Sequence, residues 1–382
     1  MATGTSTDPY VVSSWEEFIE DYNNNSYAGS YVKFTNNRRT EYNLAKSYPS
    51  GVSGGLVIYP NILGNGAAWK NLYTYGGQFG INFIGTVDNL QVEALYVKDS
   101  QQIAKFDADI SNVIMSAEIT TSAELYVMNK GATSNITFDN CQMDLKCICR
   151  EGASRTLYFI GGGESKTVTM NNCEMRLDWQ GFYSIQFITP TILNACLFNG
   201  YVQADGDMVR FYDFKQGTTV DYPESLIDID FDADSIYYDS YTSDTSAKVY
   251  YNSDKTPDFA DGSLTNAWVG LTNAQIASET ALNNAGFHTG GDSPWIYVDG
   301  NVRQEDWEEL EMLGALSYPV NGLAFCNSYY NGKECIVPLS AQSIGRYAFA
   351  GNTFKKVILP ANCTYYKTSF SGKPVTGGIL IE

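Results

Sequence analysis

The sequence contains very little histidine and little charge. His288 is the one histidine among 382 residues, and charged residues make up only 18% of the chain. Most hydrolytic triads and most zinc sites need at least one histidine, so few such sites are open to this protein. His288 lies between Gly286-Phe287 and Thr289-Gly290-Gly291. We interpret it as a surface loop residue rather than a general base, which would need a positioned partner.

Basic residues are also scarce. Lys and Arg total 24 against 43 Asp and Glu, which gives a net charge of −19. Binding to nucleic acid or to anionic lipid needs a basic face, so we expect neither partner. No apolar run approaches the 18 residues of a membrane span, so membrane insertion is not expected either. No glycine-rich phosphate loop or His-Glu-x-x-His motif occurs, and we predict no cofactor and no metal.

The N-terminal stretch lacks the features of a secretory signal, because residues 1–8 have neither a basic region nor an apolar one. We therefore expect folding in a reducing cytoplasm and interpret the eight cysteines as thiols rather than disulfides. Cys147 and Cys149 would share one face of a strand, which favours core packing over a metal site.

A short repeat is the most informative pattern present. Each copy begins with a small turn residue. The next three residues are expected to point their side chains into the core, outward and into the core again. The steps between copies are 23, 28, 32 and 23 residues. We predict that equivalent residues stack about 4.8 Å apart in two internal columns, with the asparagines at a corner where Asn tolerates left-handed backbone. The copies are Asn89-Leu-Gln-Val92, Asn112-Val-Ile-Met115, Asn140-Cys-Gln-Met143, Asn172-Cys-Glu-Met175 and Ala195-Cys-Leu-Phe198.

The two Asn-Cys-x-Met runs resemble the rung motif of the right-handed parallel β-helix family. The resemblance covers residues 49–240 and implies a mainly β solenoid; a β-sandwich with coincidental Asn-Cys pairs is the alternative. Residues 1–48 would form an N-terminal attachment and cap segment. Within it, Trp15, Phe18, Ile19 and Tyr22 share one helical face behind a Ser14/Glu17 capping box, as in the caps of β-helical phage proteins. A helix that binds a partner is the other interpretation.

The C-terminal part divides into two segments. Residues 241–319 are expected to form a transition with capping helices, one from a Thr272 cap to Gly286 and one over Gln304–Leu313. Residues 320–382 contain Ile336-Val-Pro and Ile358-Leu-Pro repeats with prolines 22 residues apart. This pattern resembles BspA-like leucine-rich repeats, a family associated with adhesion and protein binding. The resemblance implies a small α/β module, and two visible units are too few to stand alone.

Catalytic and sugar-binding candidates are few. A β-helix enzyme would use paired carboxylates on its outer face, and Glu174, Asp178, Asp205 and Asp207 are the candidates if the protein is a polysaccharide lyase or glycoside hydrolase. Trp179, Tyr183 and Tyr212 are either sugar-stacking surface rings or core and subunit contacts. Asp228, Asp230, Asp232 and Asp234 alternate with apolar residues, and we favour an outward acidic strand face over a calcium loop, because Ala233 stands where such a loop needs Gly.

Together these features lead to the hypothesis of a non-enzymatic bacteriophage virion protein. It would be a head or tail fibre, spike or decoration protein, folded in the host cytoplasm and located on the virion. We expect a homotrimer that contacts other virion proteins and a host-surface glycan or protein, with its acidic charge aiding solubility. A tailspike-like polysaccharide depolymerase and a bacterial surface adhesin are the alternatives.

Overall fold

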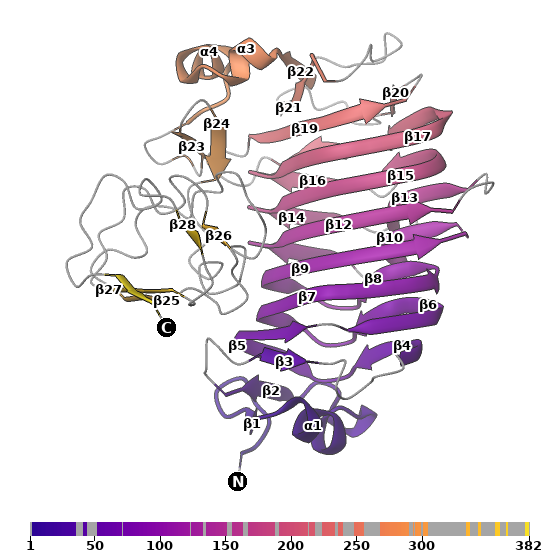
Figure 1. Ribbon diagram of the computed structural model, residues 1–382, viewed down its shortest axis with the longest axis vertical. Coiled ribbons are helices and arrows are strands. Elements are labelled where there is room, and N and C mark those ends of the chain that lie inside the picture. The colour runs from indigo at the N-terminus through magenta and orange to yellow at the C-terminus, as the bar shows by residue number, and fades with distance from the viewer. Residues whose placement is uncertain are drawn as a thin grey trace.

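The computed structural model is mainly β, with 65% strand and 10% helix. It describes residues 2–35, 41–43, 52–70, 72–122, 124–132, 135–150, 155–162, 167–187, 191–212, 214–217, 224–233, 236–239, 248–255, 268–289, 293, 295–298, 301–304, 334–336, 343–344, 356–359, 364–365 and 379–381. The strands stack from β1 at the bottom of Figure 1 to β22 near its top.

Twenty-two of the described strands form one parallel sheet, and they pair in three ladders. The first ladder contains β1 (Tyr10–Val12), β2 (Tyr31–Phe34), the beginnings of β5 (Asn61–Lys70), β7 (Val87–Ser100) and β9 (Ile110–Thr121), then β11 (Ile136–Asp139), β14 (Val168–Asn171), β16 (Thr191–Asn194) and β18 (Phe214–Gln216).

The second ladder continues from the same β5, β7 and β9. It contains β3 (Glu41–Asn43), these three strands, then β12 (Gln142–Cys149), β15 (Glu174–Phe187), β17 (Leu197–Tyr212), β19 (Ser225–Asp232), β21 (Val249–Asn252) and β22 (Trp268–Leu271). The third contains β4 (Val52–Ile58), β6 (Tyr73–Phe83), β8 (Gln102–Phe106), β10 (Leu125–Ala132), β13 (Thr156–Gly162), the ends of β15 and β17, and β20 (Ile236–Asp239).

The predicted fold class, a right-handed parallel β-helix solenoid, is wrong. The parallel strands form a closed eight-strand β-barrel. The repeat indicates which segments are neighbours, but it does not determine how the sheet closes. Some strands are long enough to belong to two ladders, such as β15 with 14 residues and β17 with 16. These two strands stay paired with each other on both sides of a shift in register.

The two predicted internal columns are present. Met143 pairs with Met115 on one side and with Met175 on the other, and Met175 pairs with Phe198. All of them are buried, as are the members of the first column, which are Leu90, Val113, Cys141, Cys173 and Cys196. Because side chains alternate along a strand, these residues fill one continuous apolar interior.

The corner asparagines adopt the predicted left-handed backbone. Asn89, Asn112, Asn140 and Asn172 have φ angles of 52°, 53°, 50° and 49°. The amide of Asn140 donates to Oδ1 of Asn112 at 3.3 Å, so neighbouring corners are hydrogen-bonded. Ala195, the fifth member, has a φ of 52° without such a side chain.

The N-terminal end is covered by a short helical segment. An α-helix, α1 (Trp15–Glu17), is capped by Ser14 and continues as a π-helical turn, η1 (Phe18–Tyr22); a 3-10 turn, η2 (Asn25–Tyr27), follows. Trp15 and Phe18 are buried and meet the ring of Trp69, with centroids 5.0 and 5.9 Å away. One half of the predicted capping box is present, because the Glu17 amide donates to the Ser14 hydroxyl. The Glu17 carboxylate accepts from the Ser13 amide instead of the Ser14 amide.

The predicted single helix that starts from the Thr272 cap is broken in two. α3 (Asn273–Ile276) begins at a Thr272 capping box, α4 (Glu279–Ala285) begins at Ser278, and Gly286 ends it with a φ of 91°. Ser278 competes for the backbone as a second N-cap, which ends the first helix early. The predicted helix over Gln304–Leu313 is wrong at Gln304, which ends β24 (Asn301–Gln304) opposite β23 (Trp295–Val298). Residues 305–313 lie outside the described part.

The tail repeat forms parallel pairs. β25 (Glu334–Ile336), β27 (Lys356–Leu359) and β29 (Ile379–Ile381) make one small sheet, and Ile336 pairs with Ile358 as the repeat predicts. β26 (Ser343–Ile344) pairs with β28 (Thr364–Tyr365). Most of residues 320–382, including Cys326 and Cys363, lie outside the described part.

Candidate functional site

The outer surface of β12, β15, β17 and β19 carries a set of carboxylate side chains. Its outward residues alternate with buried ones, as the burial pattern of β19 shows for Asp228, Asp230 and Asp232. The prediction of an outward acidic face is therefore confirmed for these three; Asp234 lies outside the described part. We call the set Asp144, Glu174, Asp178, Asp228, Asp230 and Asp232 the acidic face.

Basic residues partly neutralise the acidic face. The Arg176 guanidinium lies 3.9 Å from the Asp144 carboxylate and 3.4 Å from that of Glu174. Lys255 lies 2.9 Å from Asp228. These contacts follow from the register, because Asp144 and Arg176 are direct neighbours on β12 and β15. The face is thus an ion-pair network rather than a row of unpaired carboxylates.

Asp144 is the carboxyl whose titration is most affected by this environment. Burial raises its pKa above the ordinary value, the Arg176 guanidinium opposes that shift, and the Glu174 and Asp178 carboxylates add to it. A carboxyl that holds its proton more tightly is suited to act as a general acid. The sequence contained a signal for this pair, since Asp144 alternates with Met143 and Leu145, and the repeat that aligns Met143 with Met175 also aligns Asp144 with Arg176.

The predicted catalytic residues lie in different surroundings. Glu174 is only 2% exposed and accepts a hydrogen bond from the Asn199 amide at 3.3 Å. Asp178 lies on the same outward face and accepts from Gln180 at 2.5 Å. Asp205 is exposed and lies beyond the other end of this face, near Cys149. The Asp207 side chain is outside the described part.

The predicted sugar-stacking rings also lie in different surroundings. Trp179 is buried against Phe159 and Phe187, so the core interpretation is right for it. Tyr183 is 53% exposed, whereas the Tyr212 side chain lies outside the described part. The exposed rings of Tyr73, Tyr75 and Tyr96 were missed, although they share an alternating pattern with buried Thr74 and Val97.

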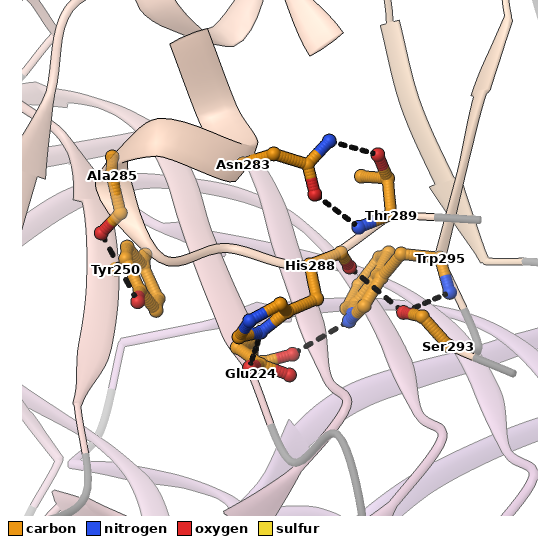
Figure 2. Close-up of polar contacts among 8 residues, drawn as sticks. All are labelled: Glu224, Tyr250, Asn283, Ala285, His288, Thr289, Ser293 and Trp295. Carbon is orange, nitrogen blue, oxygen red and sulfur yellow. Dashed lines mark hydrogen bonds and ion pairs between the residues drawn. The ribbon is translucent and has the colours of Figure 1, made fainter. Parts of the chain in front are cut away.

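His288 is exposed, as predicted for a loop residue, but it has a partner. Its Nδ1 contacts Oε1 of Glu224, the residue that precedes β19, and the indole of Trp295 donates to the Glu224 carbonyl at 2.7 Å (Figure 2). The loop between them is held by Ser293, whose hydroxyl donates to the His288 carbonyl at 2.8 Å. We call Glu224, His288, Ser293 and Trp295 the clasp.

The clasp has the form of a structural contact rather than a catalytic one. The Ser293 hydroxyl is directed at a backbone carbonyl and not at the imidazole, so Ser293 is not placed as a nucleophile that His288 activates (Figure 2). Beneath it lies a small apolar cluster that contains Tyr250, Phe287 and Trp295. Burial raises the pKa of Tyr250 to about 12, with a further contribution from the Glu224 charge.

Within the described ranges, no group of three or more His, Cys, Asp or Glu side chains is placed to hold a metal ion. Five of the cysteines, Cys141, Cys147, Cys149, Cys173 and Cys196, are buried free thiols. The helices in the described part of the chain are all too short or too polar to cross a membrane. Comparison with protein-family models, curated proteins and solved structures found no significant match.

Proposed function

We propose that this protein is a non-enzymatic structural appendage of a bacteriophage particle, such as a fibre, spike or decoration protein, that attaches the particle to its host. The observation that carries the proposal is the continuous apolar interior, which runs through one parallel sheet from Val12 to Trp268. In-register stacking of this kind makes a stiff support with long outer surfaces for contacts.

The buried thiols support an intracellular site of assembly. Cys141, Cys173 and Cys196 follow one another in the core as free thiols. Disulfides are typical of secreted proteins, whereas thiols persist where the cytoplasm is reducing. A protein that is folded in a host cell and released by lysis needs no secretion. We further propose that it forms a homotrimer on the virion, contacting other virion proteins and a glycan or protein of the host surface.

Two measurements test this function. The first is labelling of purified particles from a lysate that carries the gene, using antibodies against the recombinant chain. The second is competition, in which the purified chain should reduce adsorption of the particles to host cells. Absence of the protein from particles, together with no effect on adsorption, would overturn the proposal. Light scattering tests the assembly, where a trimer has three times the 42.2 kDa chain mass.

A tailspike-like depolymerase is the second candidate, and the pair Asp144 and Asp178 favours it. Asp178 is two residues beyond Arg176, the direct neighbour of Asp144. Strand spacing and rise put their Cα atoms about 8 Å apart on one outward face. From such positions the two carboxyl groups can reach the separation of about 6.5–9.5 Å found in inverting glycosidases. The raised pKa of Asp144 fits the acid role. Release of reducing ends from host glycan, lost in both Asp144→Asn and Asp178→Asn, would establish this activity; no release would exclude it.

A further inference from the structure

Three tyrosines form an exposed cluster on β6 and β7, the dark purple strands in the lower half of Figure 1. Tyr73, Tyr75 and Tyr96 are 37%, 38% and 45% exposed. Tyr73 is the direct neighbour of Tyr96 in the sheet. The rings of Tyr73 and Tyr75 have centroids 6.1 Å apart at an angle of 33°. We call these residues the tyrosine platform.

The platform is bordered by polar groups. Tyr75 lies between Ser53 of β4 and Lys98 of β7, and Tyr96 lies beside Glu118 of β9. The Glu118 carboxylate is 3.5 Å from the Lys146 ammonium, so its charge is already paired. Lys98 has no ion-pair partner among the residues that the structure describes. The surface therefore offers flat aromatic faces next to a hydroxyl and a lysine ammonium, in a chain with a net charge of −19.

The size of the platform decides which class of partner it fits. A tyrosine side chain contributes about 150–250 Å², so three rings exposed by roughly two fifths offer about 200–300 Å². A stable protein interface needs about 800 Å² on each partner, with a fully buried apolar core. A sugar ring needs only one aromatic face, with hydrogen-bond donors at its edge to bind its hydroxyl groups.

From this geometry we propose that the tyrosine platform is a glycan-binding site, on which pyranose rings stack against Tyr73, Tyr75 and Tyr96 while Lys98 and Ser53 bind sugar hydroxyls or carboxylates. The inference deepens the proposed host-attachment function, and it rests on that function for its biological role. Tyr96 lies three strands from Asp178 of the acidic face, in one column of neighbours that runs through Glu118 and Lys146.

Affinity electrophoresis tests the site in native gels that contain dextran, mannan, hyaluronan or alginate. Two of these probes are neutral and two carry uronate groups, so the panel separates stacking alone from stacking plus a contact with Lys98. We expect at least one polysaccharide to retard the full chain. Each of Tyr73→Ala, Tyr75→Ala and Tyr96→Ala should weaken the retardation about two- to tenfold, which corresponds to one aromatic contact. Lys98→Ala should weaken binding of the uronate polymers more than binding of the neutral ones.

The control is Tyr183→Ala, because Tyr183 is a tyrosine that is even more exposed, at 53%, and lies on β15 outside the platform. Retardation by none of the four polymers would overturn the proposal. Equal losses in Tyr183→Ala and the platform variants would overturn it as well. Circular dichroism and thermal melts identify any variant that has unfolded. If an alanine variant is unfolded, the same tyrosine is changed to leucine instead, which keeps apolar bulk but removes the ring.

Failure of the site and failure of the proposed function give different results. If the chain competes for host adsorption and the triple platform variant competes equally well, attachment stands and the glycan site is wrong. If the chain binds a polysaccharide through the platform but is absent from particles, the site stands and the virion function is wrong.

Discussion

The carboxylate of Glu224 contacts the imidazole Nδ1 of His288, 64 residues further along the chain. This contact joins the connection after α4 to the start of β19, next to the hydrogen bond from Trp295 to the Glu224 carbonyl. The clasp therefore attaches the segment with α3, α4 and β23 to the end of the large sheet. Because the His288 side chain is 54% exposed, solvent screens the ion pair.

The clasp should depend on its tryptophan more than on its histidine. We expect His288→Ala to lower the free energy of unfolding by no more than about 1 kcal/mol, as for other exposed pairs. Trp295→Ala removes a fully buried ring and should cost about 3–5 kcal/mol. Urea unfolding measures both, and limited proteolysis between residues 286 and 295 reports local opening. A larger effect from His288→Ala than from Trp295→Ala would contradict this account. Lys98→Ala, far away and exposed, is the control.

The stability of the methionine column should depend on the volume of its side chains more than on their sulfur atoms. Met143 and Met175 are fully buried neighbours in the core. Met175→Ala leaves a cavity and should lower the free energy of unfolding by about 2–5 kcal/mol. Met175→Leu conserves the volume and should cost less than about 1.5 kcal/mol. Denaturant melts compare the two variants, and similar losses in both would argue against a close-packed column.

The corner asparagines should be sensitive to their backbone angle. Asn140 has a φ of 50°, where an alanine costs about 1–2 kcal/mol. We expect Asn140→Ala to be destabilised by that amount plus the loss of the bond to Asn112, whereas Asn140→Gly loses only the side-chain contact. Thermal melts distinguish them, with Asn199→Ala on a regular strand as the comparison. A glycine variant less stable than the alanine variant would show that backbone strain is not the dominant effect.

The sequence was sufficient to predict the local features of this fold. Residues such as Cys141 and Met143 follow a two-residue alternation that assigns them to the interior, and Asn140 marks a left-handed corner. The alignment of the two tail repeats places Ile336 opposite Ile358, and these residues pair in the structure. Each of these follows from a few adjacent residues, so no information about distant parts of the chain is needed.

Features that depend on distant residues were not predictable in the same way. Closure of the sheet depends on how β15 and β17 bend between two ladders, and no short motif encodes that. The partner of His288 lies 64 residues away, and nothing near Glu224 indicates it. The repeat aligns Asp144 with Arg176, but it gives no indication that Lys255 lies 2.9 Å from Asp228.

Asp144 should make the stability of the protein depend on pH. Its pKa in the folded state is raised above 3.8 by burial, so folding favours the protonated form. The associated stability is fully present below pH 3.8 and is lost as the pH rises through the folded-state pKa. We therefore expect the free energy of unfolding of Asp144→Asn, relative to that of the native protein, to be higher at pH 7 than at pH 3.5. Urea unfolding at both pH values measures this. Ser116→Ala, on the neighbouring strand, should have the same effect at both.

The buried thiols should be unreactive while the protein is folded. Burial raises the pKa of Cys147 and of Cys173 well above the ordinary thiol value, and the nearby Cys141 and Cys196 add to the shift at Cys173. Only the thiolate attacks alkylating reagents, so at pH 8 both cysteines should resist iodoacetamide until urea unfolds the chain. Peptide mass spectrometry resolves each site, which separates them from Cys326, Cys335 and Cys363. Rapid labelling of Cys173 in the native state would mean that the interior opens without unfolding, and a stiff support for attachment would then be excluded.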